Sequence, residues 1–353
     1  MKWTVCIELL IEIEYGGALQ STSVSSARDR HVLPLAGKLH EHNKERSVSI
    51  VSVIEIENLT KDYGHGRGIF HINLSVEKGE CFGFLGPNGA GKTTTIRHLM
   101  GFSRPQEGSA KILGKECRDH AADLQNTVGY LPGEIALPNG ITGTEFLQMM
   151  RKMRHVENEE YCNMLLDKFE LDPRIETKQM SLGVKRKLAV VTAFLHDPDI
   201  LILDEPTSGL DPLMQEKFIE YILSEKKRGK TIFLSSHIFH EVDQTCDRIA
   251  IIKDGEIVSE FASGELSQKR DKIYRVTVKD QESYERLMKL PYHFASVNPK
   301  KARARVHVPA GELNHFVRDI SGLNVNDFHE IPFTLEDYFM QFYKEDHVFE
   351  GVK

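Results

Sequence analysis

Cysteine is scarce in this chain, and its spacing excludes two kinds of cross-linked small domain. No C-x-x-C pair is present, so the sequence indicates neither a structural zinc site nor a disulfide framework. An odd number of widely spaced cysteines fits a reducing compartment such as the cytosol. Three of them sit in apolar stretches, where we expect core thiols rather than reactive ones. The five cysteines are Cys6, Cys81, Cys117, Cys162 and Cys246.

Long apolar runs are also missing. No segment approaches the ~18 uninterrupted apolar residues of a membrane-spanning helix. The first fifteen residues look hydrophobic, but Glu8, Glu12 and Glu14 interrupt them. They also lack the basic start and the small-residue cleavage site of a secretory signal. We therefore expect any membrane role to come through a partner chain.

The chain also lacks an excess of basic residues. The net charge of −7 and the isoelectric point near 6.2 give no general attraction to nucleic acid or anionic lipid, so we expect no nucleic-acid partner. What is present is an ordinary globular composition of 353 residues, 40% hydrophobic and 27% charged. That length suffices for about two domains.

Residues 1–50 differ from the rest of the chain in composition and in their lack of a periodic pattern. After the first fifteen they are rich in Ser, His, Arg and Lys and follow no sustained period. We expect them to be a disordered extension or to precede the true start of translation. Val51 is a candidate start, and Lys44-Glu45 fits a translated ribosome-binding sequence.

The segment 51–268 is predicted to form one α/β domain. It opens with Val53-Ile54-Glu55-Ile56, which alternates as a half-buried strand. Apolar strands at 200–203 and 231–235 then alternate with helical patterns, as in a sheet covered on both faces. A helical subdomain is predicted over about 135–185, where apolar residues recur at helical spacing.

The segment 269–353 is predicted to be a small α+β accessory domain. Its strand and helix patterns over 272–331 follow the order β-α-β-β-α-β, the split arrangement of ferredoxin-like domains. A capped amphipathic helix is predicted for 334–340. Two interpretations of the basic middle hairpin stay open, a solvated edge or a contact with the cytoplasmic loops of a membrane partner. Its basic residues are Lys300, Lys301, Arg303 and Arg305.

The most informative stretch fits the phosphate-binding pattern G-x-x-x-x-G-K-[ST]. A short apolar strand precedes it and a helix follows, so backbone N–H groups and the helix N-terminus can converge on a polyphosphate. Lys92 would reach the β- and γ-phosphates, and the Thr93 hydroxyl would ligate Mg²⁺. The candidate ligand-binding residues are Gly86, Pro87, Asn88, Gly89, Ala90, Gly91, Lys92, Thr93 and Thr94.

Two carboxylates end a later apolar strand, Leu201-Ile202-Leu203-Asp204-Glu205. Ligands of parallel α/β sheets sit beyond the carboxyl ends of the strands. Asp204 is therefore a candidate ligand of Mg²⁺ or its water, and Glu205 a candidate general base. The alternative is that the two carboxylates cap the next helix.

Together these motifs resemble the ATP-binding cassette (ABC) family over residues 53 to about 268. The loop at 86–94 matches Walker A, residues 201–206 match Walker B, and Ser208-Gly209-Leu210-Asp211 matches the D-loop. Ser236-His237 matches the H-loop. The resemblance implies a P-loop NTPase fold with a mixed sheet and a helical subdomain, ATP and Mg²⁺ as cofactors, and Glu205 and His237 as catalytic residues. It also places Tyr63 against adenine.

Two motifs depart from the family pattern. The signature LSGGQ falls on residues 180–184, where Ser181 and Gly183 are kept and Leu182 is not. The motif implies contact with ATP on an opposite subunit, hence a head-to-tail dimer, and Leu182 leaves less room there. The Q-loop glutamine falls at Gly133, which has no side chain to reach Mg²⁺; Glu134 is a candidate substitute.

The resemblance implies an ATPase subunit that powers a separate transmembrane permease. It would be cytoplasmic, attached to the inner face of the membrane, and part of a homodimer or heterodimer. The C-terminal unit and the GYLP sequence before Gly133 resemble the ABC-2-type exporters of drugs, antibiotics or peptides. An importer ATPase and a soluble regulatory ATPase are the alternatives, and the transported substrate stays open.

Overall fold

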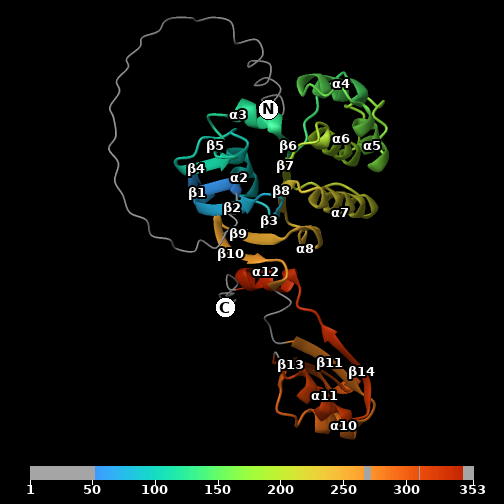
Figure 1. Ribbon diagram of the computed structural model, residues 1–353. Coiled ribbons are helices and arrows are strands. Elements are labelled where there is room, and N and C mark those ends of the chain that lie inside the picture. The colour runs from blue at the N-terminus through green and yellow to red at the C-terminus, as the bar shows by residue number, and fades with distance from the viewer. Residues whose placement is uncertain (1–51, 266–271, 310, 345–353) are drawn as a thin grey trace, which may run out of the picture.

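The structure is a computed structural model that describes residues 52–265, 272–309 and 311–344 (Figure 1). The predictions for residues 1–50 lie outside the described residues. We call 52–265 the large domain and 272–331 the small domain. Among the described helices, none combines the length and the apolar character needed to cross a bilayer.

The core of the large domain is a six-stranded sheet in the order β10-β9-β3-β8-β7-β6. Its strands are parallel except β10, which runs antiparallel to β9. Every residue of β3, β7 and β8 is buried, as a sheet covered on both faces requires. The predicted α/β core is confirmed. The strands are β3 (Cys81–Leu85), β6 (Val128–Leu131), β7 (Ile200–Asp204), β8 (Thr231–Ser236), β9 (Arg248–Lys253) and β10 (Glu256–Ala262).

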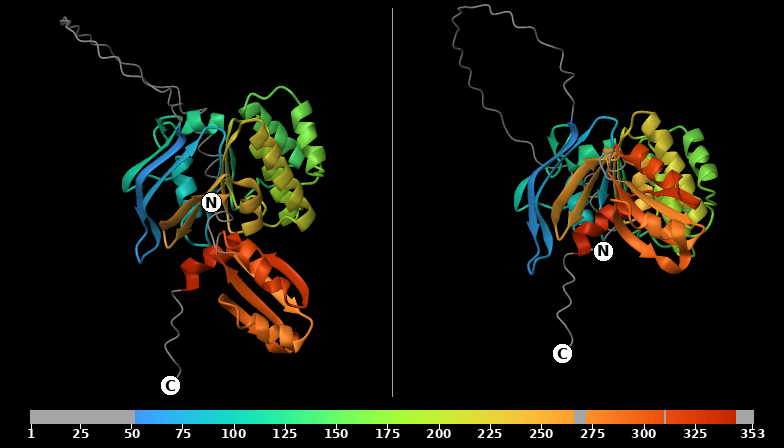
Figure 2. Two further views of the ribbon diagram at one scale, coloured as in Figure 1. Left: turned by 60° about the horizontal axis from the view of Figure 1, so that its bottom comes forward. Right: turned by 90° about the horizontal axis from the view of Figure 1, so that it is seen from below.

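A second, antiparallel sheet in the order β2-β1-β4-β5 forms an outer layer (Figure 2). Residues of β1 and β2 join Phe82 and Phe233 of the central sheet in one apolar cluster, together with Ile96 and Leu99 of α2 (Lys92–Leu99). This layer holds α2 against the central sheet. The strands are β1 (Ser52–Asp62), β2 (Gly68–Glu77), β4 (Glu107–Ile112) and β5 (Lys115–Glu116).

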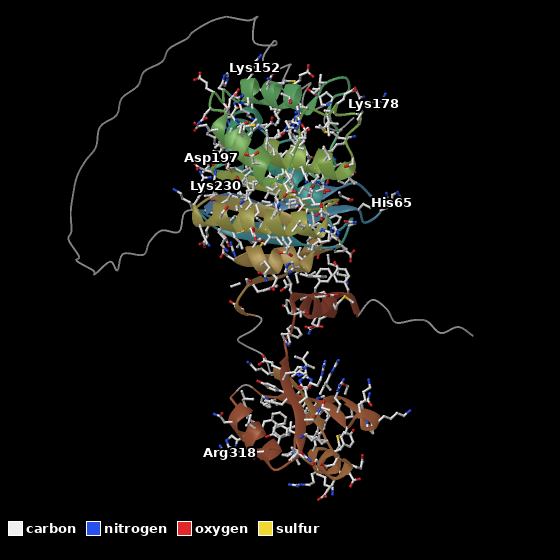
Figure 3. All side chains as sticks on the ribbon, turned by 90° about the vertical axis from the view of Figure 1, so that its right-hand side faces the viewer. His65, Lys152, Lys178, Asp197, Lys230 and Arg318 are labelled. Carbon is white, nitrogen blue, oxygen red and sulfur yellow. The ribbon has the colours of Figure 1, made fainter. Side chains whose placement is uncertain are left out.

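The remaining helices of the large domain include a group, α4 to α6, on one side of the central sheet (Figure 1). Helix α4 begins at a capping box in which Thr142 and Glu145 each accept the other's backbone N–H. Beside α7, the ammonium of Lys230 lies 2.5 Å from Asp197 (Figure 3). The helices are α3 (Ala121–Thr127), α4 (Gly143–Met153), α5 (Glu160–Lys168), α6 (Leu182–Phe194), α7 (Pro212–Lys227) and α8 (Phe239–Thr245).

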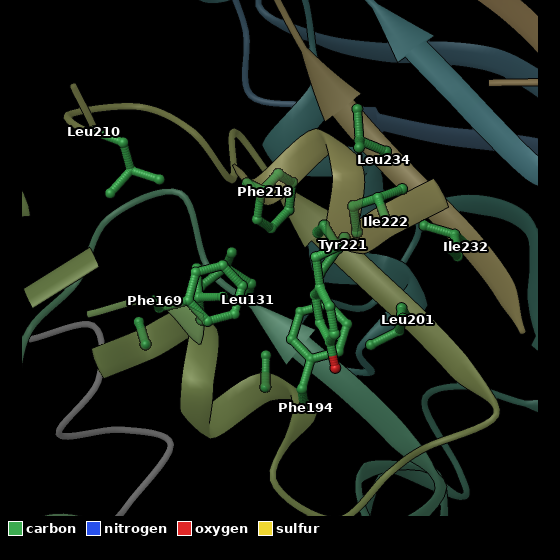
Figure 4. Close-up of a cluster of buried hydrophobic side chains, with 14 of the residues drawn as sticks. Leu131, Phe169, Phe194, Leu201, Leu210, Phe218, Tyr221, Ile222, Ile232 and Leu234 are labelled. Atoms are coloured by element: carbon green, nitrogen blue, oxygen red, sulfur yellow. The ribbon is translucent and has the colours of Figure 1, made fainter. Parts of the chain in front are cut away.

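Aromatic packing joins this helical group to the central sheet (Figure 4). The Tyr221 ring on α7 meets Phe169 edge-on at 5.4 Å and Phe194 at 4.9 Å between centroids. Edge-to-face pairs of this kind add to the free energy gained by burial. The cluster therefore fixes α6 and α7 against the central sheet.

The small domain is a four-stranded antiparallel sheet in the order β12-β13-β11-β14. Its chain order is the predicted β-α-β-β-α-β, with α10 and α11 on one face. Tyr274, Val276 and Phe316 belong to its separate core. Its elements are β11 (Lys272–Val278), α10 (Gln281–Leu287), β12 (His293–Asn298), β13 (Arg303–Val308), α11 (Leu313–Ser321) and β14 (Val325–Ile331), with a 3₁₀ turn, η1 (Pro299–Lys301).

The last helix, α12 (Leu335–Lys344), returns to the large domain (Figure 1). Its Phe339 ring packs edge-on against Phe239 of α8 at 5.0 Å. The Lys253 ammonium donates to the Phe342 carbonyl at 2.8 Å. The helix that follows the small domain in sequence thus belongs to the core of the large domain.

Candidate nucleotide-binding site

The loop between β3 and α2 has a conformation that its glycines permit. Gly89 and Gly91 have φ of 87° and 113°, in the region that favours glycine. A Cβ on Gly91 would lie 2.7 Å from Ile69 Cγ2, and one on Gly86 would lie 2.6 Å from the Ile252 carbonyl oxygen. The backbone can fold this tightly only without side chains at these positions.

Lys92, the first residue of α2, turns back into this loop. Its ammonium donates to the carbonyls of Gly86 at 2.6 Å and Pro87 at 3.0 Å. It also lies 2.9 Å from Glu205 Oε1, and only 5% of its side chain is exposed. A buried ammonium at the N-terminus of a helix favours an anionic ligand.

Asp204 ends β7 and is fully buried. Its Oδ2 accepts from the Thr93 hydroxyl at 2.8 Å and its Oδ1 from Ser235 at 2.5 Å. Burial raises the pKa of the Asp204 carboxyl, and these two hydrogen bonds oppose the shift. A hydroxyl and a carboxylate side by side are hard oxygen ligands and fit Mg²⁺. Within the described residues no cluster of three or more His, Cys, Asp or Glu offers another metal site.

Glu205 follows in a strained backbone conformation, with φ of 49°. Its N–H donates to the Ser235 carbonyl at 3.0 Å, which links the ends of β7 and β8. Its Oε2 lies 2.5 Å from His237 Nδ1. The turn therefore aims the carboxylate at both Lys92 and His237.

A pocket of ≈ 400 Å³ lies beside these side chains, and all of them except Lys92 and Ser235 line it. The predicted residues Asn88, Thr93, Asp204, Glu205 and His237 line it, so sequence positions far apart converge as expected. A pocket of this size beside Lys92 and the loop suits a phosphate chain.

Other predicted residues lie elsewhere. Ser181 caps α6 by accepting from the Val184 N–H at 3.3 Å, and Asp211 caps α7 by accepting from Met214 at 3.0 Å. Neither Ser181 nor Gly183 is among the residues that line the pocket. Gly183 instead faces the D-loop, since a Cβ there would lie 3.1 Å from the Gly209 carbonyl oxygen.

Tyr63 occupies the turn between β1 and β2 and is 56% exposed. The Lys61 ammonium lies 5.7 Å from its ring centroid. The same turn ends at Gly68, whose carbonyl oxygen would be 3.3 Å from a Cβ on Gly91. The ring is thus carried on a turn that borders the phosphate-binding loop and is open for stacking.

Gly133 lies against the carboxylate of Asp204. A Cβ at this position would be 3.0 Å from Asp204 Oδ2, so a side chain here would reach the candidate metal ligand directly. Glu134 lines the pocket beside it. Gly133 itself presents no side chain to this carboxylate.

Sequence reasoning missed Arg186, which ties three segments together. The guanidinium is 3% exposed and donates to the carbonyls of Pro132 at 2.9 Å, Gly133 at 2.6 Å and Ser208 at 2.9 Å. Burial lowers its pKa, and the charges of Asp204 and Glu205 oppose the shift. The run Lys185-Arg186-Lys187 looks solvated, but position 186 shares a helix face with the buried Val190.

Glu241 was also missed. It is 1% exposed and accepts from the Ser236 hydroxyl at 2.5 Å, directly before His237. Burial raises the pKa of this carboxyl to about 7. A glutamate on α8 in an otherwise polar stretch gave no signal in the sequence.

Fold and site together define a P-loop nucleotide-binding protein. The family model described as ABC transporter matches residues 69–208. The chain is 32% identical over 294 residues to the bacitracin transport ATP-binding protein BcrA of Enterococcus faecalis, covering 81% of this chain and 95% of that protein. It is 35% identical over 250 residues to the Nod factor export ATP-binding protein I of Sinorhizobium fredii, covering 68% and 73%.

Solved structures agree. A solved structure of an ATP-binding subunit of an ABC transporter superposes with a TM-score of 0.56 and 29% identity, covering 61% of this chain and 91% of that one. The dimeric cassette MJ0796 bound to ADP and Pi, at 23% identity and a TM-score of 0.55, shares the fold. The chain therefore belongs to the ABC transporter family, as an ATP-binding subunit with ATPase activity.

Proposed function

We propose that the chain hydrolyses MgATP in the 400 Å³ pocket to power a separate membrane permease that exports its substrate. The observation that supports this most is the meeting of Lys92, Glu205 and His237, with Glu205 within 2.9 Å of the ammonium and 2.5 Å of the imidazole. Such a set can bind a phosphate chain, accept a proton and stabilise developing negative charge in one place.

Binding begins at the head of α2. The loop N–H groups and Lys92 receive the phosphates, and Lys92 exchanges its carbonyl partners for phosphate oxygens. Thr93 and Asp204 would hold Mg²⁺, which would neutralise phosphate charge. Tyr63 stacks on the adenine ring. The residues 86–94 named above form the cradle.

Hydrolysis then depends on Glu205. Release of Lys92 to the phosphates leaves the Glu205 carboxylate free to accept a proton from the attacking water. His237 holds the other carboxylate oxygen and lies where charge develops on the transferred phosphoryl group. The strained backbone of Glu205 fixes this orientation before nucleotide binds.

A second ATPase subunit completes the site. Ser181 and Gly183 sit at the N-terminus of α6, a helix of 13 residues, yet do not line the pocket of their own chain. Leu182 between them is 62% exposed. These donors therefore serve the γ-phosphate bound to a partner copy, identical or related, with Asp211 and the D-loop at the same interface.

The names of the relatives support export as the direction of transport. One is a bacitracin transport protein and another a Nod factor export protein. A drug, antibiotic or peptide is the substrate class that we propose. The permease would hold the chain at the inner face of the cell membrane.

The test uses Glu205→Gln, with Glu216→Gln as the matched control because Glu216 is exposed on α7. We expect the Glu205 variant to lose at least about a hundredfold in ATPase rate, and to elute as a dimer in MgATP during size-exclusion chromatography. The control should behave as the parent. A Glu205 variant that hydrolyses ATP at the parental rate, or stays monomeric in MgATP, contradicts the mechanism.

Transport coupling needs a second measurement. A permease co-expressed with the chain should copurify with it and stimulate the ATPase of the parent but not of the Glu205 variant. An ATPase that is active alone and copurifies with no candidate permease would favour a soluble regulatory role. Uptake instead of efflux in vesicles would favour the importer alternative.

A further inference from the structure

The small-domain sheet has one face covered by helices and one open face. Along β11, Tyr274, Val276 and Val278 are buried under α10 and α11. The alternate residues Ile273, Arg275 and Thr277 therefore point to the open face. The same alternation places Arg303, Arg305 and His307 of β13 on that face.

Like charges lie directly opposite each other there. Arg275 on β11 pairs in register with Arg305 on β13 and with His329 on β14. Directly opposed residues have Cβ atoms about 5 Å apart, and opposed like charges destabilise a sheet. One row across the open face thus carries two arginines and a histidine side by side, at a cost to stability.

These arginines also lack internal partners. Among the described residues, none of Arg275, Arg303 and Arg305 forms an ion pair; Arg303 donates only to Thr277 Oγ1 at 3.3 Å. The Arg275 Nε is buried without a hydrogen-bond partner. The nearby acid, Asp327, lies 3.1 Å from His329. Two guanidinium groups that oppose each other without an internal carboxylate favour a negative partner from outside.

We infer that this open face, centred on Arg275 and Arg305, is a docking surface for an acidic, extended segment of a partner protein. Guanidinium forks bind carboxylates in a bidentate way, which suits two arginines spaced across neighbouring strands. Ile273 pairs with Ile331 beside them, so apolar side chains between the acids find a contact.

The composition of the face favours a peptide over a nucleic acid. The open-face positions of the described strands carry no Phe, Tyr or Trp on which bases could stack; their rings are histidines, with His293 and His307 at 5.1 Å between centroids. Short runs of carboxylates interleaved with apolar residues match both the charge and the isoleucines.

The experiment uses the full chain and a fluorescein-labelled peptide of alternating glutamate and leucine, measured by fluorescence anisotropy. Arg275→Gln with Arg305→Gln should weaken binding at least about tenfold, because the charge-assisted hydrogen bonds of both guanidinium groups are lost. The control, Lys289→Gln with Arg318→Gln, removes the same charge from two exposed residues outside the strands and should bind as the parent. Figure 3 labels Arg318, which lies on α11. A glutamine-for-glutamate peptide should not bind.

Two further measurements keep the outcome unambiguous. Arg275→Lys with Arg305→Lys keeps the charge but loses the fork, and we expect an intermediate affinity. The glutamine variant should melt no lower than the parent and hydrolyse ATP normally, which separates this inference from the proposed ATPase mechanism. Parental affinity in the glutamine variant overturns the inference, as does arginine-dependent binding of oligothymidine or phosphatidylserine vesicles that is tighter than that of the peptide.

Discussion

The two domains differ in whether their charged side chains have ion-pair partners within the chain. In the large domain, Lys230 pairs with Asp197 and Glu225, and Arg248 pairs with Glu80 and Glu260. On the open face of the small domain, Arg275 and Arg305 face each other without a carboxylate. Charges in the first region are paired within the chain, whereas those in the second await a partner.

The domains also differ in how they are built. Each has its own apolar core, and that of the small domain shares no residue with those of the large one. Helix α12 follows the small domain in sequence, but its Leu335 and Phe339 belong to the core of the large domain. We therefore predict that a substitution can destabilise or inactivate one domain and leave the other unaffected.

The largest effect is expected at the nucleotide site of the large domain. Lys92→Ala removes the buried ammonium and should lower ATPase kcat/KM at least about a thousandfold, because phosphate charge is then bound without its main counter-charge. Lys78→Ala, an exposed lysine in the preceding turn, is the control. Turnover and equilibrium binding of a fluorescent ATP analogue report the result. Unchanged binding would break the assignment of the site.

The small domain should unfold independently of the large domain. Phe316 is fully buried there, and Phe316→Ala should cost about 3–5 kcal/mol of unfolding free energy in that domain. Calorimetry should show one transition lowered and another kept, with the ATPase rate unchanged. The control is Val317→Ala, which is 42% exposed. A parallel loss of ATPase activity at a temperature where the large domain stays folded would contradict the comparison.

A smaller effect is expected from Arg186, which links the signature helix to the loop at Gly133 and to the D-loop. Arg186→Gln keeps hydrogen-bonding capacity but not the charged fork, and should lower kcat about tenfold to a hundredfold with a smaller change in KM. Lys185→Gln on the same helix is the control. Equal loss in both variants, or a change in KM alone, would argue against a positioning role.

The smallest effect concerns pH. The pKa of Glu241 is about 7 in the folded chain and its ordinary value is 4.5. The raised pKa means that the protonated carboxyl stabilises the fold below the ordinary value, and this stabilisation is lost as pH rises through about 7. Glu241→Gln should therefore melt higher than the parent at about pH 8 and nearly alike at about pH 5. A pH-independent difference would contradict the assignment.

Local rules predicted much of this molecule. The glycines of 86–91 predicted a tightly folded loop. The apolar strand that ends in Asp204 and Glu205 predicted acidic side chains at the site. The alternation in 272–331 also predicted the β-α-β-β-α-β order of the small domain. In each case the signal lies within a few residues of the feature.

The rest depends on contacts between distant segments. Burial of Arg186 follows from the packing of α6 against the loops at 132–133 and 208, which no local pattern encodes. The return of α12 to α8 and the opposed arginines on β11 and β13 likewise require the register of the fold. Sequence reasoning located the chemistry but not the connections that position it.

The most direct test of the central claim pairs two assays on the full chain, equilibrium MgATP binding and phosphate release, for the parent and Glu205→Gln. The account predicts that both proteins bind MgATP and that only the parent releases phosphate at a substantial rate. A parent that binds no MgATP, or a variant that releases phosphate as fast as the parent, would contradict it.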